Sequence, residues 1–131
     1  MLILDTCVLI YDALTPERLS RKALKAIEEG ELKGNLACAD ISLWEIAMLI
    51  GKGRLDPGTD CLTFIGLVLE ARGTRVLPVT PEIACLSVHH QAFAHHDPAD
   101  RLIAATALHG KATLITCDER LLGVKGLKTL W

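Results

Sequence analysis

Residues 96–118 decide the fold, and they read HDPADRLIAATALHGKATLITCD. Asp97-Pro98 is typical of a helix start, because an aspartate caps the helix and a proline suits its first position. Apolar residues then follow at helical spacing, and the helix is expected to end at Gly110. Residues 112–116 predict a buried strand that places Asp118 at its carboxyl end. A helix followed directly by such a strand indicates a parallel α/β sheet.

The rest of the chain alternates short apolar runs with amphipathic segments. Besides the strand above, we expect strands at residues 1–4, 35–38 and 75–79, with a further edge strand at 127–131. Other helices are expected near residues 7–14, 15–30, 42–50, 59–72 and 80–88. The predicted fold class is α/β, a three-layer α/β/α sandwich with a mainly parallel central sheet of four to five short strands. Residues 1–131 are expected to form a single domain.

The composition is that of a globular chain with an aliphatic interior, since 50% of it is hydrophobic and only 4% aromatic. Fourteen basic and sixteen acidic side chains give a net charge of −2, so a phosphate-binding surface must be local or metal-assisted. The five cysteines form no Cys-x-x-Cys pair and are typical of a reducing cytoplasm, the expected location. Met1 leads directly into a short apolar run and an acid, so we expect neither a signal peptide nor a membrane span.

Four acids occupy the same kind of place, just after a strand or on the first turn of the next helix: Asp5, Glu45, Asp100 and Asp118. Because the carboxyl ends of parallel strands meet at one edge of a sheet, we expect these acids to converge there. Each alone also has a structural interpretation as a helix cap, and Ser42-x-x-Glu45 matches a capping box. Clustered carboxylates repel one another unless a cation neutralises them. An all-oxygen cluster suits Mg²⁺, with Mn²⁺ as an alternative, better than Zn²⁺.

These residues resemble the PIN-domain nucleases, in particular the VapC-type toxins of bacterial toxin–antitoxin pairs. The resemblance covers the whole chain and rests on four blocks in family order: Leu4-Asp5-Thr6, residues 42–47, residues 97–107 and residues 112–118. It implies a PIN domain over residues 1–131 and a metal-dependent endoribonuclease that cleaves phosphodiester bonds with metal-activated water. The implied catalytic residues are Asp5, Glu45, Asp100, Asp118, Thr6 and Thr116, of which Asp5, Asp100 and Asp118 would bind the metal.

The same resemblance implies three partners, namely a cognate antitoxin protein, an RNA substrate and a second copy of the chain in a homodimer. The antitoxin groove would lie near the early helices, where residues 9–11 are apolar. Basic candidates for guiding RNA are Arg101, Lys52, Arg54 and a stripe on the predicted second helix formed by Arg18, Arg21, Lys22 and Lys25. The spacing of that stripe suits a solvated helix face better than an RNA or partner contact.

Two other site chemistries are less well supported. A zinc site would draw on a group close together in sequence, formed by Cys85, His89, His90, His95 and His96, but its adjacent histidine pairs lack regular ligand spacing. Cys7 and Cys117 stand beside the acids, whose field raises a thiol's pKa and argues against a cysteine hydrolase.

Two interpretations other than a nuclease stay open at this point. A phospho-acceptor receiver-like switch needs paired acids after its first strand and a phosphatase needs Asp-x-Asp, whereas this chain has Asp5-Thr6-Cys7. A catalytically idle α/β binding module would use the same fold only to bind a partner.

Overall fold

The structure, a computed structural model, describes residues 1–94 and 96–131. In these ranges five parallel strands form one sheet in the order β3-β2-β1-β4-β5. The strands are β1 (Leu2–Leu4), β2 (Leu36–Ala39), β3 (Arg75–Leu77), β4 (Thr113–Ile115) and β5 (Thr129–Leu130). The helices are α1 (Thr6–Leu14), α2 (Arg21–Lys33), α3 (Ile41–Gly51), α4 (Cys61–Arg72), α5 (Pro81–His89), α6 (Pro98–His109) and α7 (Glu119–Leu122).

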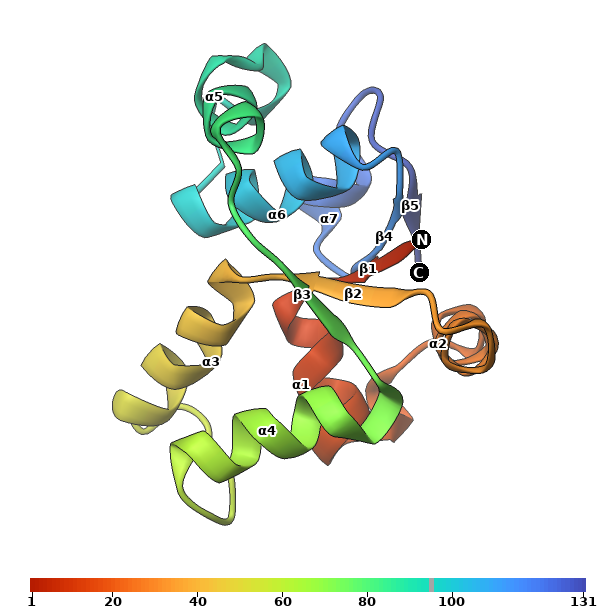
Figure 1. The fold of residues 1–131 in the computed structure, drawn as a ribbon, viewed down its shortest axis with the longest axis vertical. Helices are drawn as coiled ribbons and strands as arrows, with labels where there is room; N and C mark the ends of the chain where they lie inside the picture. The colour runs from red at the N-terminus through yellow and green to blue at the C-terminus, as the bar shows by residue number, and fades with distance from the viewer. Residues whose placement is uncertain (95) are drawn as a thin grey trace.

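Helices cover both faces of the sheet, so the predicted three-layer α/β/α sandwich is confirmed. Figure 1 shows α5, α6 and α7 on one face and α1 to α4 on the other. Each face has its own buried cluster, the first around Ile3, Ile103 and Leu114 and the second around Leu4 and Ile115. Neighbouring residues of β1 and β4 thus point to opposite clusters, as alternation along a strand requires.

The predicted helix over residues 15–30 is wrong at its beginning. Thr15-Pro16 starts only a 3-10 turn, Pro16–Arg18. α2 begins after Ser20, whose hydroxyl accepts a hydrogen bond from Ala23 N at 3.0 Å. The α-helix therefore begins where the Ser20 side chain caps it, and not at the earlier start that the proline predicts. Arg18 is therefore separated from the helix that carries the rest of the predicted basic stripe.

The same helix does not end at Gly30 but continues to Gly34, which takes a left-handed conformation with a φ of 64°. Gly30 serves packing instead, because it is buried where α2 crosses the start of β2. A Cβ added at Gly30 would lie 2.5 Å from Leu36 Cδ2 and 3.0 Å from Leu2 Cδ1. The close approach of the helix to two strands requires glycine at this position.

The strand order reverses between β1 and β4, because the chain builds β2 and β3 on one side of β1 and β4 and β5 on the other. At such a switch point the loops that leave the two central strands diverge and open a crevice at the carboxyl edge of the sheet. Asp5 follows β1 and Asp118 follows β4 beyond two further residues. The topology therefore brings both acids to the rim of one crevice.

Among the described residues, the structure contains no helix that is both long and apolar enough to span a membrane.

Candidate active site

Asp5 lies at the centre of the site, and hydrogen bonds from α1 and from the segment at the end of β4 orient it. Its backbone N donates to Ile115 O at 3.0 Å, which extends the pairing of β1 with β4. Its carboxylate caps α1 by accepting from Thr6 N at 2.8 Å, and it also accepts from the Thr116 hydroxyl at 2.6 Å. With 5% of its surface exposed, Asp5 is a buried carboxylate whose orientation is set by two neighbouring elements.

Glu45 reaches this site from α3, and the capping-box interpretation of Ser42 and Glu45 is wrong. α3 begins two residues earlier than a Ser42 cap would require, at Ile41, so Ser42 lies inside the helix and is fully buried. Thr6 Oγ1 lies 2.5 Å from Glu45 Oε1 and 2.9 Å from Ser42 Oγ. Because a threonine has one hydroxyl proton, Thr6 donates it to the carboxylate, the stronger acceptor. Glu45 is thereby aimed toward α1 and the hollow.

Asp100 lies on the first turn of α6, directly above the cap of that helix. Asp97 accepts a hydrogen bond from Asp100 N at 2.9 Å, so the predicted capping role of Asp97 is confirmed. The Asp100 side chain is 8% exposed as a residue, and among the described residues its Oδ2 accepts no hydrogen bond. The nearest cation to this oxygen is Arg120 Nη2 at 3.6 Å, an ion-pair contact beyond hydrogen-bond length.

Asp118 caps the short helix α7 and is held by Arg120. It accepts from Arg120 N at 2.9 Å, while Arg120 Nε and Nη2 approach its two oxygens at 3.2 Å each. The guanidinium of Arg120 thus lies between Asp118 and Asp100, although most of this side chain is exposed. In this arrangement the arginine supplies the positive charge that the two carboxylates require.

All four acids line one hollow of about 300 Å³, so their predicted convergence is confirmed. The residues around it are Asp5, Thr6, Cys7, Ile10, Tyr11, Glu45, Leu49, Asp100, Cys117 and Asp118. Thr116 does not reach the surface and lies behind Asp5, which it holds through the hydrogen bond above. Five of the six predicted catalytic residues therefore line the hollow, and the sixth supports it.

The carboxylates carry altered proton affinities because they are buried beside one another. Burial, and then the nearby Asp97, Asp5 and Asp118, raise the pKa of Asp100 to about 7. Burial is also the main cause that raises the pKa of Asp5 and of Glu45, against the hydrogen bonds of Thr116 and Thr6. For Asp118, burial acts upward but the contacts with Arg120 outweigh it, so its pKa is lowered. Asp5, Glu45 and Asp100 therefore favour the protonated form unless a positive charge lies close to them.

The donor set fits a hard divalent cation. Four carboxylates and the Thr6 hydroxyl line one hollow, and the buried Oδ2 of Asp100 has an acceptor lone pair that is not used by the described residues. In the described ranges, however, no three His, Cys, Asp or Glu side chains are positioned to hold a metal ion together. Asp118 and Asp100 contact the guanidinium of Arg120 instead.

The zinc interpretation of the histidine run finds no support. His90 caps the 3-10 turn after α5 by accepting from Ala92 N, and its ring stacks on Phe93. His96 Nε2 contacts Arg120 O at 3.0 Å. His95 lies outside the described residues. These contacts are the capping and surface roles expected for the histidines that the structure describes.

The field of the acids acts on Cys7 as expected. Burial and then Asp5 raise the pKa of the Cys7 thiol far above its ordinary range. A raised pKa lowers the fraction of the thiol that is ionised, which argues against a catalytic thiolate at this position.

Arg120 and Ser42 also belong to the site, although Arg120 is not among the predicted site residues and Ser42 is predicted only as part of a capping box. The only local signal for Arg120 is its position two residues after Asp118, which is ambiguous on the first turn of any helix. Arg101, a predicted RNA contact, donates from Nε to the His96 carbonyl at 2.7 Å and from Nη2 to the Ala94 carbonyl at 2.8 Å. It stabilises the loop before α6.

The PIN domain profile matches residues 2–127, which is almost the entire chain. The chain therefore belongs to the PIN-domain family. It is similar to Ribonuclease VapC22 of Mycobacterium tuberculosis (strain ATCC 25618 / H37Rv), with 35% identity over 119 residues that cover 91% of this chain and 88% of VapC22. Family membership favours the nuclease interpretation over the receiver-like switch.

Solved structures share the fold at low sequence identity. The VapBC2 structure from Rickettsia felis, bound to a promoter DNA fragment, has a TM-score of 0.73 at 17% identity and covers 98% of this chain and 96% of its own. The DNA-bound VapBC structure from Salmonella typhimurium has a TM-score of 0.72, with the same identity and coverages. These likenesses confirm the predicted PIN-like architecture.

Proposed function

We propose that this protein is a Mg²⁺-dependent endoribonuclease, with Mn²⁺ as an alternative cation, and that it is the toxin of a toxin–antitoxin pair. The observation that carries the proposal is the meeting of Asp5, Glu45, Asp100 and Asp118 in one hollow at the carboxyl edge of the sheet. The similarity to a named ribonuclease over 91% of the chain supports RNA as the substrate. Residues 1–131 act as one PIN domain in this proposal, since the family match spans residues 2–127.

In this proposal Asp5, Asp100 and Asp118 bind the cation. A bound Mg²⁺ lowers the pKa of its water and neutralises the scissile phosphate. Thr116 keeps the Asp5 carboxylate oriented through its 2.6 Å hydrogen bond. Arg120 would have to leave these carboxylates for a cation to bind there, because both carry positive charge and share the same partners.

Glu45 acts on the attacking water. Burial raises the pKa of Glu45 toward neutral pH, and a general base is most effective when its pKa is near the working pH. Thr6 fixes one of its oxygens at 2.5 Å and leaves the other for the water. Thr6 and Ser42 are thus positioning residues that aim the base.

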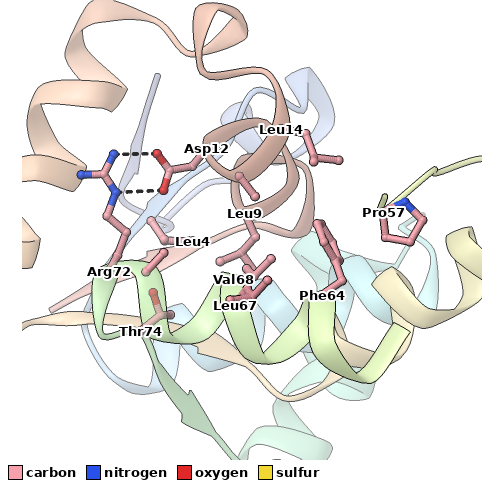
Figure 2. A pocket seen from close by; sticks show the side chains of 12 residues that line it. Leu4, Leu9, Asp12, Leu14, Pro57, Phe64, Leu67, Val68, Arg72 and Thr74 are labelled. Atoms are coloured by element: carbon pink, nitrogen blue, oxygen red, sulfur yellow. Dashed lines mark hydrogen bonds and ion pairs between the residues drawn. The ribbon is translucent and has the colours of Figure 1, made fainter. Parts of the chain in front are cut away.

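The antitoxin binds a second hollow of about 410 Å³ between α1 and α4 (Figure 2). Its apolar lining includes Leu9, Leu14 and Phe64, and Figure 2 shows Arg72 paired with Asp12 at one end. Such a lining suits an apolar segment of a partner protein. A solved toxin–antitoxin complex from Klebsiella pneumoniae shares this fold, which supports this occupant.

Two leucine variants test that occupant. Leu67 lines the hollow and is 56% exposed, whereas Leu32 on α2 is 89% exposed and lies outside it. Leu67→Lys is expected to weaken binding of the product of the adjacent small open reading frame by about tenfold or more, and Leu32→Lys is expected to leave it unchanged. Equal binding by both variants, measured by calorimetry, would place the antitoxin elsewhere.

The homodimer remains part of the proposal. Trp44 on α3 is 58% exposed and Val88 on α5 is 65% exposed, and both helices pack against α6. Large exposed apolar side chains on neighbouring elements are typical of protein interfaces. Light scattering on the purified chain is expected to give twice the monomer mass, and Trp44→Glu is expected to give the monomer.

RNA cleavage with matched variants tests the enzymatic proposal. Purified protein is incubated with total RNA in Mg²⁺ and in EDTA, beside Asp5→Asn and Glu28→Gln proteins. Glu28 is an exposed carboxylate on α2 and serves as the control. We expect cleavage only with Mg²⁺, loss in Asp5→Asn and full activity in Glu28→Gln. Cleavage that survives EDTA, or is equal in both variants, contradicts the proposal and favours an idle binding module.

A further inference from the structure

Two thiols meet at the lip of the acidic hollow. Cys7 Sγ and Cys117 Sγ lie 3.3 Å apart although 110 positions separate them in the chain. Both cysteines line the hollow and are partly exposed. Cys7 Sγ also lies 3.6 Å from Asp5 Oδ2.

The backbone fixes this contact. Leu4 pairs with Ile115 in neighbouring parallel strands, so the segments that follow them leave the sheet side by side. Cys7 lies on the first turn of α1, and Cys117 lies in the turn between β4 and α7. The other free cysteines lie on other elements: Cys38 in β2, Cys61 in α4 and Cys85 in α5.

We propose that Cys7 and Cys117 form a redox modification site, in which a low-molecular-weight disulfide oxidises them reversibly to a Cys7–Cys117 bridge that weakens cation binding by the adjacent acids. The bridge itself depends only on the two sulphur atoms. Its effect on cation binding rests on the proposed function.

The exchange balances without any further reagent. The thiolate of one cysteine attacks a sulphur atom of the oxidant and expels one small thiolate, which leaves a mixed disulfide on the protein. The second cysteine then attacks the protein sulphur and expels the second small thiolate. Two electrons pass to the oxidant, and the two thiol protons end on its two reduced halves. The 3.3 Å contact between the two sulphur atoms makes the second step intramolecular.

Closure of the bridge acts directly on the acids. A disulfide has an S–S separation of about 2.05 Å, so the sulphur atoms must approach by about 1.3 Å from their 3.3 Å contact. Asp5 lies two residues before Cys7, and Asp118 immediately follows Cys117. The bridge also removes the thiol proton that points to Asp5 Oδ2. Disturbance of groups around a metal ligand typically weakens metal binding or activity by about 10–100-fold.

A variant that keeps Cys7 and Cys117 but lacks two of the other cysteines tests whether the Cys7–Cys117 bridge forms. Cys61→Ser/Cys85→Ser protein is treated with glutathione disulfide, and peptides are mapped by mass spectrometry. Mn²⁺ affinity is measured by calorimetry before oxidation, after oxidation and after reduction with dithiothreitol. Cys7→Ser in the same background is the matched control, and thermal melting confirms that each protein is folded.

We expect a Cys7–Cys117 linked peptide, about tenfold weaker Mn²⁺ binding, and recovery on reduction, while the Cys7→Ser control keeps its affinity. Absence of the linked peptide in folded protein overturns the site. A linked peptide with unchanged Mn²⁺ affinity overturns its coupling to the acids. Reduced protein that binds no Mn²⁺ and cleaves no RNA refutes the proposed function instead, and the peptide map still decides whether the bridge forms.

Discussion

The Thr116 hydroxyl donates a 2.6 Å hydrogen bond to Asp5, a residue 111 positions earlier in the chain. The bond joins the ends of β4 and β1, the two strands between which the strand order reverses. It fixes the orientation of a buried carboxylate that lines the hollow.

Asp100→Asn is expected to separate activity from stability. The substitution removes a carboxylate whose Oδ2 accepts no hydrogen bond from the described residues. RNA cleavage should fall by about 100-fold or more, because a proposed cation ligand is lost. The metal-free variant should be at least as stable as the parent protein at neutral pH, because the amide is uncharged among acids. A variant that melts much earlier than the parent in EDTA would show that Asp100 serves the fold.

The stability of the metal-free protein is expected to fall as the pH rises. Asp100 has a pKa of about 7 in the folded protein, against about 3.9 in an unfolded chain. Between these values the folded state holds a proton that the unfolded state has released. The resulting stability is complete below about pH 4 and is lost as the pH rises to about 7. Asp5 and Glu45 act in the same direction, and Asp118 acts in the opposite direction.

Thermal melting in EDTA checks this dependence. The Tm is expected to be several degrees lower at about pH 7.5 than at about pH 5.5. Mg²⁺ should raise the Tm more at the higher pH, where it does not compete with protons. In Asp100→Asn most of the pH dependence should disappear. A Tm that rises with pH in EDTA is the opposite result.

Gly30→Ala is expected to destabilise the protein by about 1–3 kcal/mol through overpacking. The added Cβ would lie 2.5 Å from Leu36 Cδ2 and 2.9 Å from Asn35 Oδ1. The energetic cost of these overlaps is larger than the stability that alanine adds to a helix relative to glycine. Gly66→Ala on α4 is the matched control, because nothing lies within 4 Å of its added Cβ. The control should gain about 0.5–1 kcal/mol. Urea denaturation measures both, and equal shifts would contradict the close approach of α2 to the sheet.

Arg72→Ala is expected to cost about 1–3 kcal/mol, because it leaves the partly buried Asp12 carboxylate without its cation. Arg72 joins three helices, with contacts of 2.8 Å to Asp12 on α1 and 2.7 Å to Glu31 on α2. The exposed pair of Lys25 and Glu29, at 3.9 Å, provides the control. Lys25→Ala should change the free energy of unfolding by less than about 0.5 kcal/mol. Similar costs for both would show that the Arg72 cluster is as weak as a surface pair.

The sequence predicts the parts of this protein in which local and global signals agree. The Asp97-Pro98 start of α6 and the buried β4 combine capping chemistry with the correct periodicity, and both are where the pattern places them. The convergence of the four acids also follows, because the carboxyl ends of parallel strands share one edge.

The failures occur where two local signals compete or a tertiary contact decides. Ser42 and Glu45 satisfy a capping pattern, but both side chains hydrogen-bond to Thr6 of α1 instead. Thr15-Pro16 satisfies a helix-start pattern, but Ser20 caps the helix instead. The contacts of Arg120 and the meeting of Cys7 with Cys117 depend on the fold as a whole, and no spacing rule reaches them.

We propose above that the acids of the hollow bind a divalent cation in place of Arg120. Anomalous diffraction from crystals grown with Mn²⁺ can locate this cation, with Asp100→Asn crystals as the control. We expect one or more Mn²⁺ peaks in contact with Asp5, Asp100 and Asp118, with the Arg120 guanidinium turned away, and weaker peaks in the variant. Mn²⁺-soaked crystals in which Arg120 still pairs with Asp118 and no peak lies among the acids would contradict it.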